Sequence, residues 1–140
     1  MKKLFVVLGI GLCLQQAHAT NWVQTVITDE FIIYIDNDSI KTNRFTNGGT
    51  YVSVWSKLQY HHEQESSFGR GRYTHMLSLL NFDCQKQKRS MSYIAVYNQD
   101  KPIRSFNTEI SVQSSSTWNH IIPDTPDYIH LNHVCSLAKK

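Results

Sequence analysis

Glycine, proline and cysteine are scarce in this chain, which contains six, three and three of them, respectively. The low glycine and proline content excludes a collagen-like repeat, and a hydrophobic content of 41% excludes a disordered chain. The chain has no long hydrophobic run except near its N-terminus, and that run is about half of the ~20 residues that span a bilayer. The remaining composition is typical of one folded domain of ordinary size.

The N-terminus has the three parts of a secretion signal. Lys2 and Lys3 precede the apolar run 4–14, and the small residues Ala17 and Ala19 follow it. We therefore expect residues 1–19 to be a signal peptide and residues 20–140 to form the mature domain. Without the two lysines, the excess of basic over acidic residues falls to one. Such a balance gives no reason to expect nucleic acid as a partner, because nucleic acid requires a concentrated basic face.

Two cysteines remain once Cys13 leaves with the signal. An exported chain meets an oxidising compartment, so Cys84 and Cys135 are predicted to form a disulfide. The loop that this bond closes is worth ~4 kcal/mol in the chain-entropy model. Lipidation of Cys13 is the alternative, although Leu12 is larger than the residue that normally precedes a lipidated cysteine.

Six segments rich in aromatic and β-branched residues indicate β-strands. Turn signals separate some of them, including Asp36–Ser39, Asn47–Gly49 and Asn98–Pro102. The polar stretch 61–72 contains two glycines and predicts a long loop. The predicted strands cover 22–27, 31–35, 51–57, 73–84, 88–97 and 103–110.

The C-terminal segment changes from a strand pattern to a helix pattern. Thr125 suits an N-cap, Pro126 suits the first helical position, and Asp127 suits the positive end of the helix dipole. Apolar positions then recur every three or four residues, at Leu131, Val134, Cys135 and Ala138. The predicted fold class is therefore α+β: an antiparallel sheet of about six strands with a C-terminal helix packed on one face and linked to it by the disulfide.

The strand 73–84 is predicted to have two apolar faces. The two-residue period places Met76, Leu80, Phe82 and Cys84 on the face that should carry the helix. The opposite face is predicted to hold Tyr73, Leu77, Leu79, Met91, Tyr93 and Tyr97. A solvated sheet face is usually more polar. Either loops cover these residues, or a second copy of the chain does in a homodimer.

The ordered set of segments resembles the surface-adhesin protein E family of Gram-negative bacteria. The resemblance rests on 34–40 (YIDNDSI), 52–55 (VSVW), Asp83-Cys84 with the basic residues that follow, 118–123 (WNHIIP) and Val134-Cys135. It covers about Trp22 to Cys135. It implies a β-sheet with a disulfide-linked helix and a role in binding host extracellular-matrix or serum proteins, such as vitronectin, laminin and plasminogen. It also implies that a dimer can form.

The residue types needed for catalysis or metal binding show no strong pattern. His130 and His133, with His120, are candidate zinc ligands, but solvated histidines beside the apolar stripe are the favoured interpretation. His61, His62 and Glu63 are predicted at a loop tip. No phosphate-binding loop, dinucleotide fingerprint or nucleophile elbow is present. We therefore expect a non-enzymatic protein without a cofactor.

Basic residues supply the candidate partner-binding side chains. Arg70 and Arg72 flank Gly71 and are suited to bind sulfated sugars or acidic groups. The residues Lys86, Lys88 and Arg89 would join them in one basic patch if the two segments lay at the same end of the sheet. Lys139 and Lys140 are a further candidate, since C-terminal lysines fit lysine-binding pockets.

Three functions are compatible with these features. The first is an exported adhesin-like protein that binds host proteins through one sheet face and its loops. The second is a periplasmic structural or accessory protein that binds another envelope component. The third is an inhibitor of a hydrolase, for which no inhibitory loop is evident. The expected location is thus the periplasm or the cell surface of a Gram-negative bacterium.

Overall fold

A computed structural model describes residues 20–66 and 71–138 and confirms the predicted α+β class. The strands are β1 (Trp22–Ile27), β2 (Phe31–Asp36), β3 (Lys41–Arg44), β4 (Thr50–Glu65), β5 (Arg72–Asp83), β6 (Lys88–Asn98), β7 (Lys101–Asn107) and β8 (Asn119–His120). A 3₁₀ turn (Asn37–Ser39) follows β2, and the helix α1 (Pro126–Leu137) comes last. The predicted signal peptide, Cys13, Arg70, Lys139 and Lys140 lie outside the described residues.

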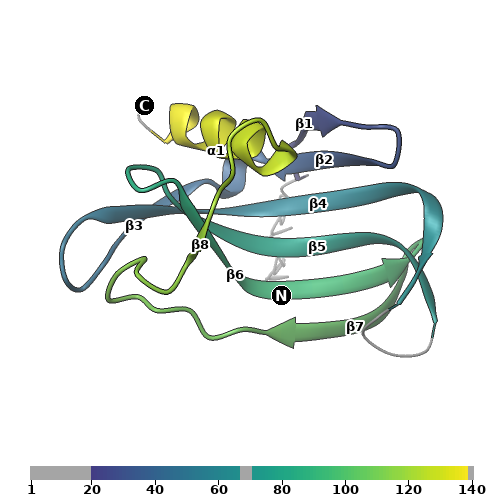
Figure 1. Ribbon diagram of the computed structural model, residues 1–140. Coiled ribbons are helices and arrows are strands. Elements are labelled where there is room, and N and C mark those ends of the chain that lie inside the picture. Colours follow the sequence, from purple (N-terminus) through teal and green to yellow (C-terminus); the bar gives the residue numbers. More distant parts are fainter. Residues whose placement is uncertain (1–19, 67–70, 139–140) are drawn as a thin grey trace, which may run out of the picture.

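All eight described strands belong to one antiparallel sheet, with the order β1-β2-β4-β5-β6-β7 (Figure 1). The six predicted strands form this path. The two short strands β3 and β8 were not predicted as separate elements, and they pair with β4 and β6, respectively. Neighbours in the path follow one another along the chain except where β3 intervenes. Consecutive pairing of this kind keeps the connections short.

The predicted loop at 61–72 is wrong at both of its ends, where the structure has strand. The strand β4 continues to Glu65 and β5 begins at Arg72, with Gln64 opposite Tyr73 and Glu65 opposite Arg72. His61, His62 and Glu63 therefore lie on the end of a strand rather than at a loop tip. Similarly, β7 begins at Lys101, so the turn before it is shorter than predicted.

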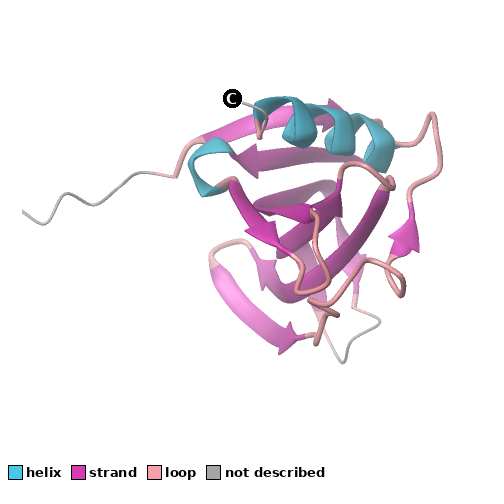
Figure 2. Ribbon diagram, turned by 90° about the vertical axis from the view of Figure 1, so that its left-hand side faces the viewer, coloured by secondary structure: helices cyan, strands magenta, loops and turns pink. Residues whose placement is uncertain are grey.

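The helix α1 packs on one face of the sheet, which we call the helix face (Figure 2). The buried core on this face combines residues of α1 with residues of β2, β4 and β5, as the pattern in 73–84 predicts. It consists of Ile35, Val52, Val54, Leu80, Phe82, Ile121, Leu131 and Val134. The face that points away from α1 is called the open face below.

The start of α1 differs in detail from the prediction. Thr125 occupies the N-cap position and Pro126 the first helical position. However, the Thr125 hydroxyl makes no cap bond and instead donates to the carbonyl oxygen of Ile122 at 2.7 Å. The Thr125 hydroxyl therefore stabilises the backbone turn before the helix and does not cap α1.

The disulfide Cys84–Cys135 is present, with a Cα–Cα distance of 5.8 Å. It joins the residue after β5 to the last turn of α1, as predicted. No helix in the described part of the chain is long and apolar enough to cross a membrane.

Candidate binding surfaces

The open face carries a hollow lined by aromatic and aliphatic side chains. Trp55, Leu79 and Tyr93 lie opposite one another on β4, β5 and β6. The Trp55 and Tyr93 rings meet edge to face, with centroids 5.5 Å apart. The hollow has a volume of about 610 Å³ and is lined by Trp55, Leu77, Leu79, Ser92, Tyr93, Ala95, Tyr97 and Asn107. Most of these side chains are only half-buried, so the face presents apolar surface to solvent.

Aromatic residues extend this surface towards both edges of the sheet. The Lys57 ammonium group lies 5.2 Å from the ring centre of Trp22 and 4.7 Å from that of Tyr34. On the other side, the rings of His75 and Tyr97 stack in parallel with centroids 5.0 Å apart. Cation–π contacts and ring stacking hold these side chains in defined positions. The open face is thus a preformed aromatic surface.

Two residues predicted on the open face lie on the helix face instead. Met91 is paired with Leu80, because the register of β5 and β6 shifts by one residue between Leu79 and Leu80. Tyr73 lies beside a second register shift, between β4 and β5, and its ring contacts that of Tyr60 with centroids 5.5 Å apart. The one extra residue in β6 moves the side chain of Met91 to the other face. The remaining four predicted residues, Leu77, Leu79, Tyr93 and Tyr97, line the open face.

The predicted basic residues do not gather in one patch within the described part of the chain. Arg72 begins β5 and Lys88 pairs with Asp83 at its other end. Eleven residue steps along a strand correspond to ~35 Å, so the two groups are far apart. Arg72 forms an exposed ion pair with Glu63 at 3.6 Å.

Lys88 and Arg89 are committed to contacts within the protein. The Lys88 ammonium group donates to the carbonyl oxygens of Ser115 and Ser116, each at 3.1 Å. The Arg89 guanidinium is 3.0 Å from the carboxylate of Asp127 in α1. By contrast, Lys86 is exposed in the turn after β5. Lys88 therefore holds the serine segment in place, and Arg89 holds α1.

The buried carboxylate of Asp83 holds the serine segment that Lys88 contacts. Asp83 is 3% exposed and accepts hydrogen bonds from the backbone amides of Gln85 and Lys86 at 3.1 and 3.0 Å. Its other oxygen accepts from the hydroxyl of the fully buried Ser115 at 2.6 Å. A buried charge is stable only when it is hydrogen-bonded in this way. No sequence pattern indicates that this serine is structural.

The histidines of α1 differ from the prediction of solvated side chains. His130 is 1% exposed, and its ring packs against Phe82 with centroids 5.4 Å apart. Burial, followed by the nearby charges of Arg89 and His133, lowers the pKa of His130 to about 4. The Nε2 atoms of His130 and His133 are buried without a hydrogen-bond partner. In the described residues, no three potential ligands come close enough to hold a metal ion.

A family model identifies the chain. The model for surface-adhesin protein E matches residues 22–136. The chain belongs to the surface-adhesin protein E family. Searches of curated proteins and of solved structures each returned no match. The matched region begins at β1 and ends after Cys135, so this adhesin-like protein has the sheet, the helix and the disulfide within the family region.

Membership confirms the resemblance seen in the sequence and makes the chain an adhesin-like, exported protein. Sequence patterns located the open face of this surface-adhesin E protein through the alternation in β5. They missed the cavity on the helix face, because its shape depends on where α1 begins and how much of the sheet it covers. The apolar alternation that includes Met76 and Leu80 was the available signal.

Proposed function

We propose that this member of the surface-adhesin protein E family is a non-catalytic protein that binds host matrix or serum proteins through its open face. The observation that carries the proposal is the aromatic surface around Trp55, Leu79 and Tyr93, which is partly exposed in the single chain. Tyrosine and tryptophan are enriched at protein interfaces, where they supply most of the binding energy. Adhesin-family membership supports a protein partner.

The proposal is tested with the mature domain, residues 20–140, and immobilised vitronectin, laminin and plasminogen. Leu79→Lys places a charge at the centre of the open face, and we expect it to weaken binding at least ~10-fold, or about 1.4 kcal/mol. Ile122→Lys is the matched control, because Ile122 is 69% exposed in the segment before α1. Circular dichroism and intact disulfide confirm folding. Equal binding by Leu79→Lys and the unmodified domain would contradict the proposal.

Two further measurements separate this proposal from its competitors. Antibody labelling of intact cells is expected for a surface adhesin, whereas labelling only after permeabilisation of the outer membrane indicates the periplasmic accessory protein. Sedimentation of the free domain shows whether a second copy occupies the open face. A dimer that Leu79→Lys dissociates, without any loss of host-protein binding, would assign this face to self-association.

A further inference from the structure

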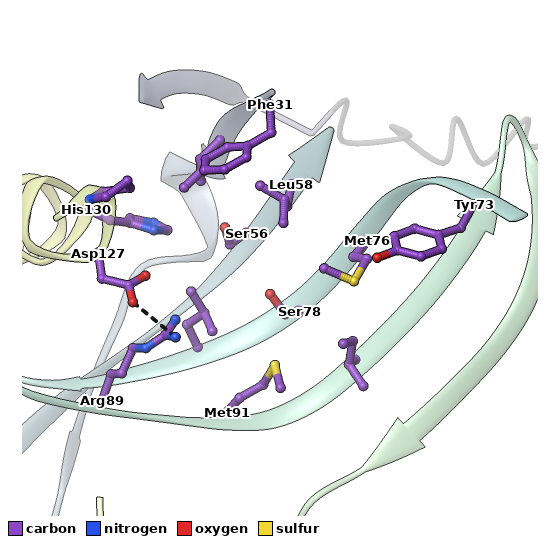
Figure 3. A pocket seen from close by; sticks show the side chains of 14 residues that line it. Phe31, Ser56, Leu58, Tyr73, Met76, Ser78, Arg89, Met91, Asp127 and His130 are labelled. Carbon is purple, nitrogen blue, oxygen red and sulfur yellow. Dashed lines mark ion pairs between the residues drawn. The ribbon is translucent and has the colours of Figure 1, made fainter. Parts of the chain in front are cut away.

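A second hollow lies on the helix face, where the first turn of α1 leaves the sheet uncovered (Figure 3). Its volume is about 470 Å³, within the range of roughly 300–1,000 Å³ typical of small-molecule sites. Strands β2, β4, β5 and β6 form its floor, and α1 forms one wall. It is lined by Phe31, Ile33, Ser56, Leu58, Tyr73, Met76, Ser78, Leu80, Arg89, Met91, Ile94, Pro126, Asp127 and His130.

The floor and the end far from α1 are mostly apolar, with the hydroxyls of Ser56, Ser78 and Tyr73 as their polar groups. Leu58, Met76 and Met91 project into the hollow, and Tyr73 lies at its far end (Figure 3). Methionine side chains adapt their shape to what they contact. Ser78 lies in the middle of the floor, where its small side chain keeps the hollow open. This part of the cavity fits a flexible hydrocarbon chain.

The charged side chains and His130 gather at the end near α1. Arg89 and Asp127 form their ion pair there, and each side chain is 38% exposed. The His130 ring projects from α1 towards the same end, and its Nε2 atom has no hydrogen-bond partner. A buried polar atom without a partner costs free energy, which a ligand atom would recover. A guanidinium has five N–H donors, so Arg89 keeps donors beyond those that face Asp127.

The charges at this end compensate each other. Asp127 neutralises Arg89, and His130 is uncharged near neutral pH. A carboxylate or phosphate head group would meet the negative charge of Asp127 as well as the positive charge of Arg89. An uncharged carbonyl avoids that repulsion and accepts hydrogen bonds from Arg89 and, in the tautomer that carries its proton on Nε2, from His130.

From this arrangement we propose that the cavity binds a single-chain acyl amphiphile with an uncharged ester or amide head. The acyl chain lies over Leu58, Met76 and Met91, and the carbonyl oxygen lies between Arg89 and His130. This site is on the opposite side of the sheet from the open face. Its occupancy and host-protein binding are therefore independent properties.

The experiment measures displacement of the uncharged fluorescent probe N-phenyl-naphthylamine from the mature domain. Monododecanoylglycerol and dodecanoate, each below its micelle concentration, are the competitors. We expect the ester to displace the probe at a concentration at least ~10-fold lower than the carboxylate. Asp127→Asn removes the repulsion and should improve displacement by dodecanoate by about the same factor.

A pair of neighbouring residues provides the control for location. Ser78→Leu fills the cavity and should weaken binding of the ester at least ~10-fold. Leu77→Ser changes the open face and should leave ester binding unaffected. Met91→Phe serves as a second filling variant if Ser78→Leu fails to fold. Absence of displacement, a preference for dodecanoate, or equal effects of the two β5 variants would overturn the proposal. A change of oligomeric state caused by Ser78→Leu alone would instead assign the cavity to a second copy and overturn it too.

Discussion

His130 introduces a polar ring into the core between α1 and the sheet. Its contact with Phe82 and its 1% exposure require the imidazole to lose its hydration. Burial disfavours the charged form, and the charge on Arg89 disfavours it further. This residue therefore couples folding to pH.

The stability of the domain should fall as His130 becomes protonated in the unfolded state. Above the unfolded pKa of ~6.5, His130 is neutral in both states and contributes no pH dependence. Between that value and the folded pKa of about 4, only the unfolded state binds a proton, so stability is lost as pH falls. The shift corresponds to a total loss of ~3 kcal/mol. Urea unfolding at about pH 7.5 and about pH 4.5 measures it.

The matched variants are His130→Phe and His120→Phe. Phenylalanine at 130 keeps a ring beside Phe82 and should remove this part of the pH dependence. His120 is exposed on β8, so its replacement should preserve the pH dependence. Identical pH dependence in His130→Phe and the unmodified domain would show that His130 does not titrate as described.

The sequence pattern placed α1 correctly but not the burial of His130. Leu131 and Val134 are apolar and follow the helical period, so they identified the buried stripe. His130 lies one turn before Val134 and shares that stripe, but histidine is usually exposed or only partly buried. The residue type therefore predicted an exposed side chain, whereas tertiary packing buries it.

At the scale of elements, the strands β4 and β5 extend beyond the core that they help to form. Their last paired residues, Glu65 and Arg72, are exposed and polar, so no apolar alternation identified them as strand. Backbone hydrogen bonds carry the pairing there. The bulge in β6 likewise lacks a clear sequence signal, and its one extra residue reverses the face that the following side chains occupy. This accounts for the misplaced Met91.

The helix α1 should depend on the disulfide for its attachment. Its 12 residues are at the lower limit of what is stable in isolation, so packing and the covalent link must hold it. Replacing Cys84 and Cys135 with alanine should lower the free energy of unfolding by ~4 kcal/mol. Amide hydrogen exchange should rise more in α1 than in the central strands β5 and β6. Urea unfolding and exchange measurements test both expectations.

The reduced wild-type domain provides the control for the alanine pair. A reductant should destabilise the unmodified domain and leave the variant unchanged. A loss below ~1 kcal/mol, with α1 still protected from exchange, would show that packing alone retains the helix.

At the scale of the whole molecule, the sheet separates two hollows of different chemistry. The open face is aromatic and broad, and the Lys57 ammonium group on it makes cation–π contacts with Trp22 and Tyr34. The helix-face cavity is smaller in volume and ends at the ion pair Arg89–Asp127. Alternation along β5 predicted the first surface. The second arises because α1 covers only part of the sheet, which no local pattern encodes.

This separation predicts how salt affects host-protein binding. If the partner binds the aromatic open face, its affinity should change less than ~3-fold between 0.1 and 1 M NaCl, although the Debye length falls from ~10 to ~3 Å. If exposed basic residues such as Arg72 and Lys86 carried the interaction, the same change would weaken it strongly. Biolayer interferometry across this range distinguishes the two cases, with Lys86→Gln as the variant that removes a charge without altering the open face. A steep loss of affinity with salt, reproduced by Lys86→Gln at low salt, would move the binding surface from the open face to the β5–β6 turn.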